Sequence, residues 1–376
     1  MEKLRLGMMG GGIGAFIGKA HQIASRICND YELVGGVFDI DFDQSKKFAV
    51  QEVINLNRVY PDIESFIKGE LAIPEDQRIQ VVSIVTPNYI HYKMAKALIK
   101  NKFHVICDKP VTTNARDAID LERLVSENNV VFCLTHTYTG YPMVREMKRK
   151  IKNGDIGTIQ RLDSQYMQGW INPIIHGGES KLATWRLDPD ISGPSSCMGD
   201  IGVHSFNLIE YTTGLKIKEV LADLSSLYEN NPLDVDGNIL LKFDENLTGV
   251  IRASQIATGE ENNLQISVYG TKGAFHWEQE NPNELKFFQE GKPYQVIKPG
   301  YEYNTDFAKE SFALPPGHPE GIYEAFANLY KGTAKAIRGE NIVDGQFPGI
   351  HDGVRGMKFI ESSLESSKNG NVWVKI

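Results

Sequence analysis

The first third of the chain alternates short, continuous apolar runs with longer segments of helical periodicity. The apolar runs predict strands at residues 4–9, 33–38, 81–85, 104–107 and 130–134. The helical periodicity lies between them, at 18–27, 43–50, 90–100 and 114–128. Continuous apolar strands are typical of a sheet covered on both faces, so this order predicts an α/β, Rossmann-type, doubly wound parallel sheet.

After about residue 138 the pattern changes to strands with partial alternation, separated by turn residues. These strands are predicted at 159–168, 217–228, 237–243, 248–255, 264–269, 274–278 and 285–289. They indicate a C-terminal α+β domain with a large, mainly antiparallel sheet. Helices expected to cover one face of this sheet lie at 196–213, 319–338 and 352–367. The other face is expected to pair subunits.

Length and composition narrow the class of protein. A chain of 376 residues exceeds what one core usually organises, which favours two domains. With 40 Lys+Arg against 48 Asp+Glu the formal charge is −8, and no long basic run supports a nucleic-acid partner. The sequence shows no signal peptide and no apolar stretch of about 20 residues, so we expect a cytoplasmic protein without a membrane span. Its four cysteines form no CxxC pair, and no metal site is expected.

A glycine-rich loop follows the first predicted strand directly: Gly10-Gly11-Gly12-Ile13-Gly14-Ala15-Phe16-Ile17-Gly18. Glycines at this place let the backbone turn tightly and approach a pyrophosphate at a helix N-terminus. The spacing Gly10-x-Gly12-x-x-Ala15 fits a dinucleotide fingerprint, but Gly14 and Gly18 also allow a longer loop with a shifted helix start. The residues expected to bind the cofactor here are Gly10, Gly12, Ile13 and Gly14.

Asp39 ends the second predicted strand, where a carboxylate can accept hydrogen bonds from ribose hydroxyls and repel a 2′-phosphate. This position favours NAD over NADP. A turn or helix-capping role is the alternative for Asp39, and nearby Asp41 and Asp43 compete for it. Lys46 and Lys47 keep NADP open, because a basic group can accommodate the 2′-phosphate.

Two further polar segments follow predicted parallel strands. Thr86-Pro87-Asn88, with His91 three residues later, comes after the strand at 81–85, and Asp108-Lys109-Pro110 comes after the strand at 104–107. Ligands of open α/β sheets bind at this carboxyl edge, so Thr86, Pro87, Asn88, His91, Asp108 and Lys109 are expected to contact the cofactor. The ammonium of Lys109 could also hold a substrate hydroxyl.

Asp200 and His204 lie at i and i+4 of a predicted helix, so both side chains can reach one site. Histidine is well suited to take an alcohol proton near neutral pH, and a carboxylate can orient the hydroxyl. Taken alone, such a pair is more often an ordinary contact on a helix face.

Taken in order along the chain, these motifs resemble the Gfo/Idh/MocA family of sugar and inositol dehydrogenases. The resemblance covers nearly the whole chain, including residues 347–374, which look like the family's closing helix and strand. It implies that Lys109 is the catalytic or nicotinamide-positioning lysine, Asp200 a substrate-orienting carboxylate and His204 the general acid/base. It also implies a homodimer or homotetramer formed through the C-terminal sheet.

Three features depart from the family pattern. Asp108 replaces the commoner Glu, the glycine loop is longer, and Thr135-His136-Thr137-Tyr138 replaces an Asn-x-Arg-Phe-like stretch. Together with Trp185-Arg186, the last resembles a subgroup acting on pyranose sugars or anhydrosugars. Aromatic faces pack on sugar C–H surfaces, while Arg and His can bond hydroxyls. The predicted substrate-binding residues are therefore His136, Tyr138, Trp185 and Arg186.

The sequence thus predicts an NAD(P)-dependent dehydrogenase with a dinucleotide-binding domain, 1–137, and a substrate-binding and oligomerisation domain, 138–376. Its substrate would be a carbohydrate or cyclitol with an oxidisable hydroxyl: a pyranose, glycoside, anhydrosugar or inositol. Two alternatives stay open. One is an NAD-dependent glycosidase or epimerase that uses transient oxidation. The other is a non-catalytic protein that senses NAD(H).

Overall fold

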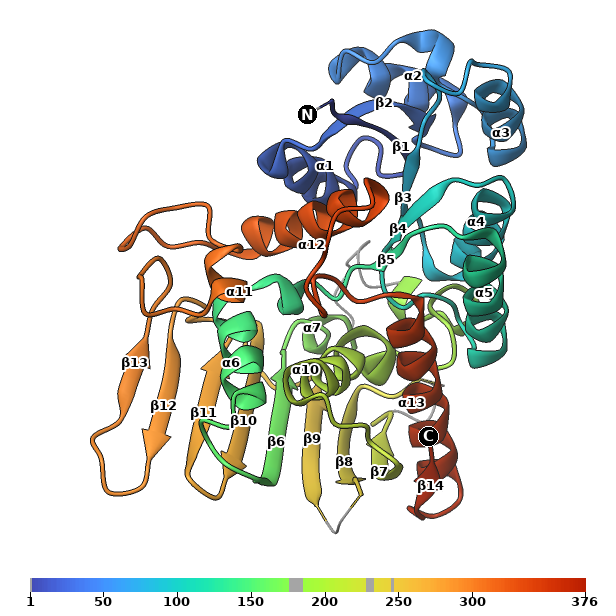
Figure 1. The fold of residues 1–376 in the computed structure, drawn as a ribbon. Coiled ribbons are helices and arrows are strands. Elements are labelled where there is room, and N and C mark those ends of the chain that lie inside the picture. The colour runs from blue at the N-terminus through green and yellow to red at the C-terminus, as the bar shows by residue number, and fades with distance from the viewer. Residues whose placement is uncertain (1, 176–184, 228–232, 245–246) are drawn as a thin grey trace. The chain divides into compact units, whose positions relative to one another are not determined.

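The computed structural model describes residues 2–175, 185–227, 233–244 and 247–376. The chain divides into two compact units, each built from separated segments (Figure 1). The N-terminal unit comprises Met1–Thr112, Arg116–Gly140 and Ile322–Val354; the C-terminal unit comprises Thr113–Ala115, Tyr141–Gly321 and Arg355–Ile376. The predicted division into dinucleotide-binding and substrate-binding domains stays a prediction, because compactness does not show which ligand a unit binds.

The N-terminal unit contains the predicted parallel sheet. Its strands are β1 (Leu4–Gly10), β2 (Tyr31–Val37), β3 (Val81–Val85), β4 (His104–Cys107) and β5 (Phe132–Leu134). Every neighbouring pair is parallel, in the order β2-β1-β3-β4-β5. All five residues of β3 are buried, as expected for a central strand covered on both faces. The Rossmann-type fold is therefore confirmed.

Helices connect these strands close to where periodicity predicted them. They are α1 (Phe16–Cys28), α2 (Phe42–Gln51), α4 (His91–Lys100) and α5 (Ala115–Asn128). The sequence prediction missed α3 (Ile63–Leu71), a helix whose N-terminus is capped by the Asp62 side chain, which accepts a hydrogen bond from the Ser65 backbone N–H at 2.7 Å.

The predicted helix at 319–338 forms as α12 (Ile322–Ile337), but the assignment of this helix to the C-terminal sheet was wrong. It packs against α1 in the N-terminal unit, where Phe326, Leu329 and Tyr330 join the core formed by Leu6 and Val81. The Tyr330 hydroxyl lies 2.8 Å from His21 Nδ1 and 2.7 Å from Ser83 Oγ. Helical periodicity predicts an apolar face, but it does not specify which sheet the face covers.

The C-terminal unit contains one nine-stranded sheet. All seven strands predicted for it from periodicity are confirmed; one short edge strand, β13, is added, and β14 at the other edge is the closing strand that the family resemblance implied. The strands are β6 (Ile159–Met167), β7 (Glu219–Ser225), β8 (Asp236–Lys242), β9 (Thr248–Ser254), β10 (Asn263–Gly270), β11 (Gly273–Glu278), β12 (Leu285–Gln289), β13 (Gln295–Ile297) and β14 (Val374–Lys375). Their order is β13-β12-β11-β10-β6-β9-β8-β7-β14. Each neighbouring pair is antiparallel except β6 and β9, which run parallel.

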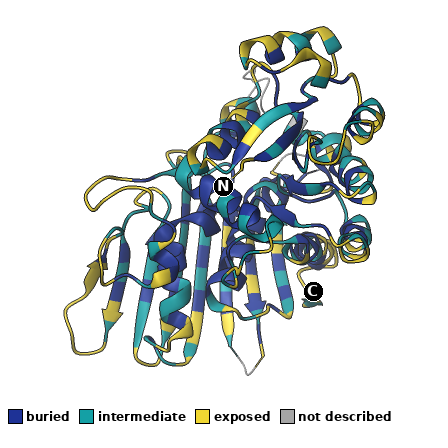
Figure 2. Cartoon of the chain, turned by 45° about the horizontal axis from the view of Figure 1, so that its top comes forward, coloured by how far each residue is buried: buried dark blue, intermediate teal, exposed yellow. Residues whose placement is uncertain are grey.

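The two faces of this sheet differ. Helices α6 (Pro142–Lys152) and α10 (Val203–Thr213) pack on one face, α10 against β6 and β10 and α6 against β11 and β12. Buried and exposed positions alternate along the strands (Figure 2). The exposed positions include the large side chains of Leu240, Tyr269 and Phe288.

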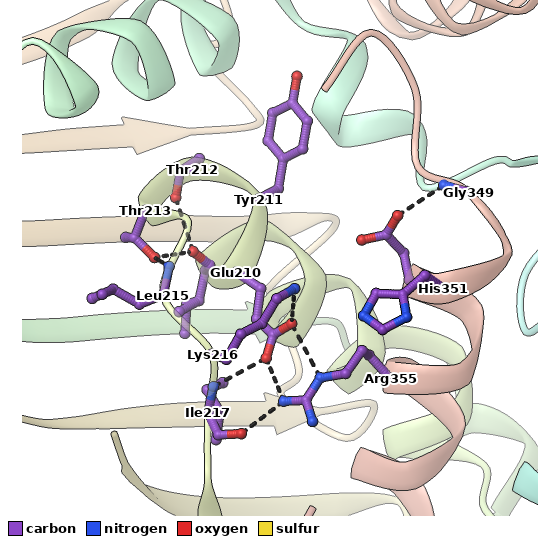
Figure 3. Close-up of polar contacts among 12 residues, drawn as sticks. Glu210, Tyr211, Thr212, Thr213, Leu215, Lys216, Ile217, Gly349, His351 and Arg355 are labelled. Atoms are coloured by element: carbon purple, nitrogen blue, oxygen red, sulfur yellow. Dashed lines mark hydrogen bonds and ion pairs between the residues drawn. The ribbon is translucent and has the colours of Figure 1, made fainter. Parts of the chain in front are cut away.

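Helix α13 (Ile350–Lys368) lies along the β7 edge, where Ser366 Oγ accepts a hydrogen bond from Ala222 N at 2.8 Å. A buried carboxylate, Glu210 at the end of α10, links α10 to α13 and to the following loop (Figure 3). It accepts hydrogen bonds from Arg355 Nη2 at 2.5 Å, Lys216 Nζ at 2.8 Å and Ile217 N at 3.0 Å.

The remaining elements are short: α7 (Asn172–Ile175), α9 (Pro189–Ser192), α11 (Asp306–Lys309), the 3-10 turns η1 (Leu56–Arg58), η2 (Asn88–Ile90), η3 (Thr137–Gly140) and η4 (Trp185–Leu187), and the π-helical turn η5 (Met198–Gly202). Among the helices of the described residues, none combines the length and apolar character needed to cross a membrane.

Candidate functional site

The glycine-rich loop joins β1 to α1 and leaves the helix N-terminus without a side-chain cap. Helix α1 begins at Phe16, and its N-cap residue, Ala15, has no side-chain group that could cap it. Gly14 has φ of 83°, and no other atom lies within 4 Å of the position a Cβ would occupy there. The first backbone N–H groups of a helix have no intrahelical partner, and this combination suits a phosphate group.

Gly18, in the first turn of α1, packs directly against the glycine-rich loop. A Cβ on Gly18 would lie 2.3 Å from the Cα of Gly11, so the helix and the loop approach each other at this point as only glycines allow. Gly18 therefore provides the close packing that the fingerprint requires of its last glycine. Helix α1 starts at Phe16, two residues before Gly18, and which glycines contact the cofactor stays a prediction.

Asp39 follows β2 and does not cap the next helix. Its Oδ1 accepts a hydrogen bond from Asp41 N at 2.9 Å, whereas Asp41 itself caps α2 by accepting from Asp43 N and Gln44 N. Lys46 pairs with Asp43 at 3.2 Å and lies 4.1 Å from the centre of the Phe42 ring. The capping role considered for Asp39 thus belongs to Asp41, whereas the turn role considered for Asp39 is present in its contact with Asp41 N.

His91 connects the two polar segments that follow β3 and β4. Its ring is buried, with Nδ1 2.9 Å from the Pro110 carbonyl oxygen and Nε2 2.8 Å from the Thr86 carbonyl oxygen. Pro110 follows a cis peptide bond from Lys109. The structure therefore brings Thr86, His91 and the Lys109-Pro110 segment together.

Asp108 and His136 lie near Lys109 in the same unit. Asp108 Oδ1 accepts hydrogen bonds from Lys109 N at 3.0 Å and from Thr135 Oγ1 at 2.8 Å. Burial, assisted by the positive charge of Lys109, lowers the pKa of His136 to about 3, so its imidazole is neutral at physiological pH. Tyr138 is buried two residues further on, in η3.

Asp200 and His204 lie in consecutive turns of the C-terminal unit. The predicted uninterrupted helix over 196–213 is instead the π-helical turn η5, which contains Asp200, followed by α10, whose first turn contains the buried His204. Such π-turns occur frequently at functional sites. The ring of Tyr166, from β6, lies 6.1 Å from the His204 ring, centre to centre.

Asp200 contacts side chains from two other segments of the C-terminal unit. Gln255 Nε2 donates a hydrogen bond to Asp200 Oδ2 at 3.2 Å, and Arg186 Nε lies 3.6 Å from the same oxygen. The guanidinium of Arg186 also lies 5.5 Å from the centre of the Trp170 ring. The predicted residues Arg186 and Asp200 are thus neighbours. The side chain of Trp185 lies outside the described residues.

The sequence prediction missed Gln168, Trp170 and Gln255. They follow the carboxyl ends of β6 and β9, which pair in parallel and end with Met167 opposite Ser254. Gln168 Oε1 accepts a hydrogen bond from Trp170 Nε1 at 2.8 Å. Both strands were predicted, but not their parallel pairing. That pairing is the signal that marks this edge, because parallel strands end on the same side of a sheet.

Asp234 fixes the start of the helical segment that contains Asp200. Its carboxylate accepts hydrogen bonds from Ser196 N at 3.1 Å and Met198 N at 2.8 Å. Burial raises the pKa of Asp234, while these hydrogen bonds act in the opposite direction. A buried carboxylate on uncapped backbone N–H groups is a stable way to begin a helix.

The fold and these residues define a class: an α/β protein with a dinucleotide-binding unit and a second unit containing acid/base side chains. Within the four described ranges, no group of three His, Cys, Asp or Glu side chains could hold a metal ion. Residues 4–136 match the model of the oxidoreductase family with an NAD-binding Rossmann fold, and residues 144–276 match the GFO/IDH/MocA C-terminal domain. The chain belongs to the Gfo/Idh/MocA family and is an NAD-binding oxidoreductase.

Relatives cover the whole chain. The uncharacterized oxidoreductase YfiI of Bacillus subtilis (strain 168) is 32% identical over 383 residues, 100% of this chain and 97% of YfiI. An inositol dehydrogenase homolog from Azotobacter vinelandii, solved with NAD+, has a TM-score of 0.94 and 31% identity, with coverage of 100% and 98%. The complex of this homolog with NADH and myo-inositol has a TM-score of 0.91 and 30% identity, with the same coverage. Levoglucosan dehydrogenase of Pseudarthrobacter phenanthrenivorans is 26% identical over 319 residues, 76% of each protein.

Proposed function

We propose that the protein is a dehydrogenase that oxidises a secondary hydroxyl of a sugar or cyclitol with NAD. The observation that carries this proposal is the group of side chains around Asp200. Arg186 and Gln255 contact the carboxylate, Trp170 lies against Arg186, and His204 follows one turn later. Relatives named for inositol and levoglucosan support the same substrate class.

The chemistry assigns a separate task to each residue. Bound NAD supplies the hydride acceptor for the hydrogen on the carbinol carbon. His204 accepts the hydroxyl proton, so the alcohol loses one hydride and one proton and becomes a ketone. Asp200 and Lys109 orient the hydroxyl during this transfer. In the reverse direction the same imidazole, now protonated, returns the proton to the carbonyl oxygen.

A mixed aromatic and polar surface suits a polyhydroxylated ring. The indole of Trp170 is partly exposed and offers an apolar face, while Arg186 and Asp200 offer donors and acceptors beside it. Sugar rings present both C–H faces and hydroxyl edges. We add Trp170 to the predicted substrate-binding residues His136, Tyr138, Trp185 and Arg186.

NAD is the preferred cofactor in this proposal. Asp39 Oδ1 accepts from Asp41 N, but Asp39 does not cap α2; its second carboxylate oxygen can accept from the ribose hydroxyls, and its charge repels a 2′-phosphate. Of the two lysines that keep NADP open, Lys46 pairs with Asp43 and lies over the Phe42 ring, whereas Lys47 is exposed. The cofactor is expected to lie along the glycine loop and the segments at Thr86 and Lys109.

The exposed face of the nine-stranded sheet is the proposed subunit interface. Leu240, Tyr269 and Phe288 are each more than two fifths exposed on three different strands. Apolar side chains at alternating positions of an open sheet indicate a surface that a second copy covers. Light scattering of the purified protein is expected to give a homodimer or homotetramer; a monomer at micromolar concentration would contradict this.

A substrate panel tests the function directly. The purified protein is incubated with NAD and, separately, with pyranoses, glycosides, anhydrosugars and inositols, while reduced nicotinamide is followed by absorbance and the sugars are analysed. Sustained NADH formation with a matching keto product is the expected result. A changed sugar without net NADH would instead indicate the glycosidase or epimerase, and NAD binding without any turnover would indicate a sensor.

A further inference from the structure

We propose that Gln255 is a positioning residue that aims the carboxylate of Asp200 at the substrate; this rests on the proposed function of Asp200. Gln255 immediately follows β9 and is completely buried. Its backbone N–H donates to the Val235 carbonyl at 2.9 Å, so the side chain starts from a fixed point. A buried amide in this place needs partners at both of its ends.

The chemistry of the two partners fixes how the amide points. Asp200, as a carboxylate, can only accept hydrogen bonds, so the Gln255 amide nitrogen must face it, at 3.2 Å. The amide oxygen then faces Ser196, whose hydroxyl donates to it at 3.0 Å. Exchanging the two ends would place the amide oxygen against the Asp200 carboxylate, two acceptors facing each other. The contact therefore has one orientation.

Ser196, which holds the amide oxygen of Gln255, is itself fixed by a buried carboxylate. Ser196 N donates to the buried carboxylate of Asp234, which also accepts from Met198 N. Asp234, Ser196 and Gln255 thus form a continuous buried series that ends on Asp200 Oδ2. Asp200 itself is 22% exposed, so a rigid, buried support holds a carboxylate that reaches the surface of the site.

Gln255→Met tests this role, because Met keeps the length and removes both hydrogen bonds. Loss of a hydrogen bond to a charged group lowers a rate or binding constant by roughly 10-fold to 100-fold. We therefore expect kcat/KM for the sugar that reacts best in the panel to fall by about that factor. The KM for the sugar is expected to rise and the KM for NAD to stay at the wild-type value, while the thermal midpoint falls because the buried Ser196 hydroxyl loses its acceptor. Gln77→Met, at an exposed position of the N-terminal unit, is the matched control and should change nothing.

Gln255→Glu adds a readout that loss of packing would not produce. When protonated, the introduced carboxyl group can donate to Asp200 as the amide does; when ionised, it repels Asp200. The ratio of this variant's kcat/KM to that of the wild type should therefore fall as pH rises. The same ratio for Gln255→Met should not depend on pH.

A double-mutant cycle separates this inference from the proposed function. If Gln255 acts through Asp200, then adding Gln255→Met to Asp200→Asn changes turnover far less than it does in the wild type. Additive losses, or a Gln255→Met enzyme with wild-type sugar kinetics, would overturn the positioning role. Full turnover by Asp200→Asn alone would instead overturn the proposed role of Asp200.

Discussion

In the N-terminal unit, candidate site side chains bond largely to the backbone of adjacent loops, whereas in the C-terminal unit they bond to other side chains. His91 faces the carbonyls of Thr86 and Pro110, and Asp108 accepts from the next backbone N–H as well as from one side chain, the Thr135 hydroxyl. Asp200, in contrast, is contacted by Gln255 and Arg186, which are distant in sequence.

This difference has a physical origin. In the parallel sheet, the order of elements alone places successive strand ends at one edge, and the loops there satisfy their own polar groups. In the mixed sheet, the candidate site side chains Gln168, Trp170 and Gln255 come together only because β6 and β9 pair in parallel and so end on the same side. The N-terminal unit should therefore be sensitive to changes of the backbone and cofactor loops, and the C-terminal unit to changes of single side chains.

The largest effect is expected at His204. His204→Ala removes the proposed proton acceptor, and general acid–base catalysis typically contributes about 10²-fold to 10⁴-fold. We expect kcat with the best panel sugar to fall within that range, while NAD affinity, measured by calorimetry, is unchanged. A variant that binds NAD and keeps full turnover would remove His204 from the mechanism.

The next effect concerns stability and the contacts in Figure 3. Glu210→Ala leaves Arg355, which is 13% exposed, without its carboxylate. Breaking a buried pair in this way costs about 3–5 kcal/mol of the free energy of unfolding. Urea denaturation measures the loss. Glu127→Ala, which breaks an exposed pair with Arg123, is the control and should leave the urea midpoint unchanged. Equal midpoints for the two variants would show that the buried contacts add nothing.

A smaller effect depends on pH and is confined to the N-terminal unit. Burial lowers the pKa of His21 to about 4, from about 6.5 in the unfolded chain. The unfolded state then binds more protons between these values, so this contribution to stability is complete above pH 6.5 and is lost as pH falls toward 4. His136, with a pKa of about 3, acts in the same direction.

His21→Asn tests this dependence. The free energy of unfolding rises with pH between pH 5 and 6, and in this variant the slope should be smaller by about 1 kcal/mol per pH unit. This is close to the slope that one extra proton bound by the unfolded state produces. His318→Asn, at an exposed position, should leave the slope as it is in the wild type. An unchanged slope in His21→Asn would mean that the buried histidine does not cause the pH dependence of stability.

The smallest effect is expected at Asp39. Asp39→Asn keeps an acceptor for the ribose hydroxyls but removes the charge that excludes a 2′-phosphate. Loss of a charged hydrogen bond should lower kcat/KM with NAD about 10-fold, and activity with NADP should rise relative to NAD. Steady-state kinetics with both cofactors measures the ratio. A ratio equal to that of the wild type would place cofactor selection elsewhere.

Sequence reasoning worked best where one local signal determines one element. The five parallel strands, the seven strands of the second sheet and the α10 and α13 helices were predicted from periodicity. The partner of α12 was not, because its apolar face fits any sheet of suitable shape. The π-helical turn at Asp200 was also missed, because it depends on how the segment packs rather than on the sequence alone.

The candidate site residues were likewise predicted only where a sequence motif marks them. Lys109, Asp200 and His204 were proposed from motif order and family resemblance, and the structure supplies their immediate contacts within each unit. Gln255 and Trp170 have no motif of their own. They become candidates only when the parallel pairing of β6 and β9 places them near Asp200 and Arg186.

Direct transfer of hydrogen from a sugar carbon to the cofactor is the central claim. The wild-type protein is incubated with NAD and ring-deuterated myo-inositol or levoglucosan, and the reduced cofactor and the sugar product are analysed by mass spectrometry. We predict that the reduced nicotinamide contains one deuterium and that the matching keto sugar accumulates with it. A converted sugar without label in the cofactor, or a reduced cofactor without label, would contradict the account.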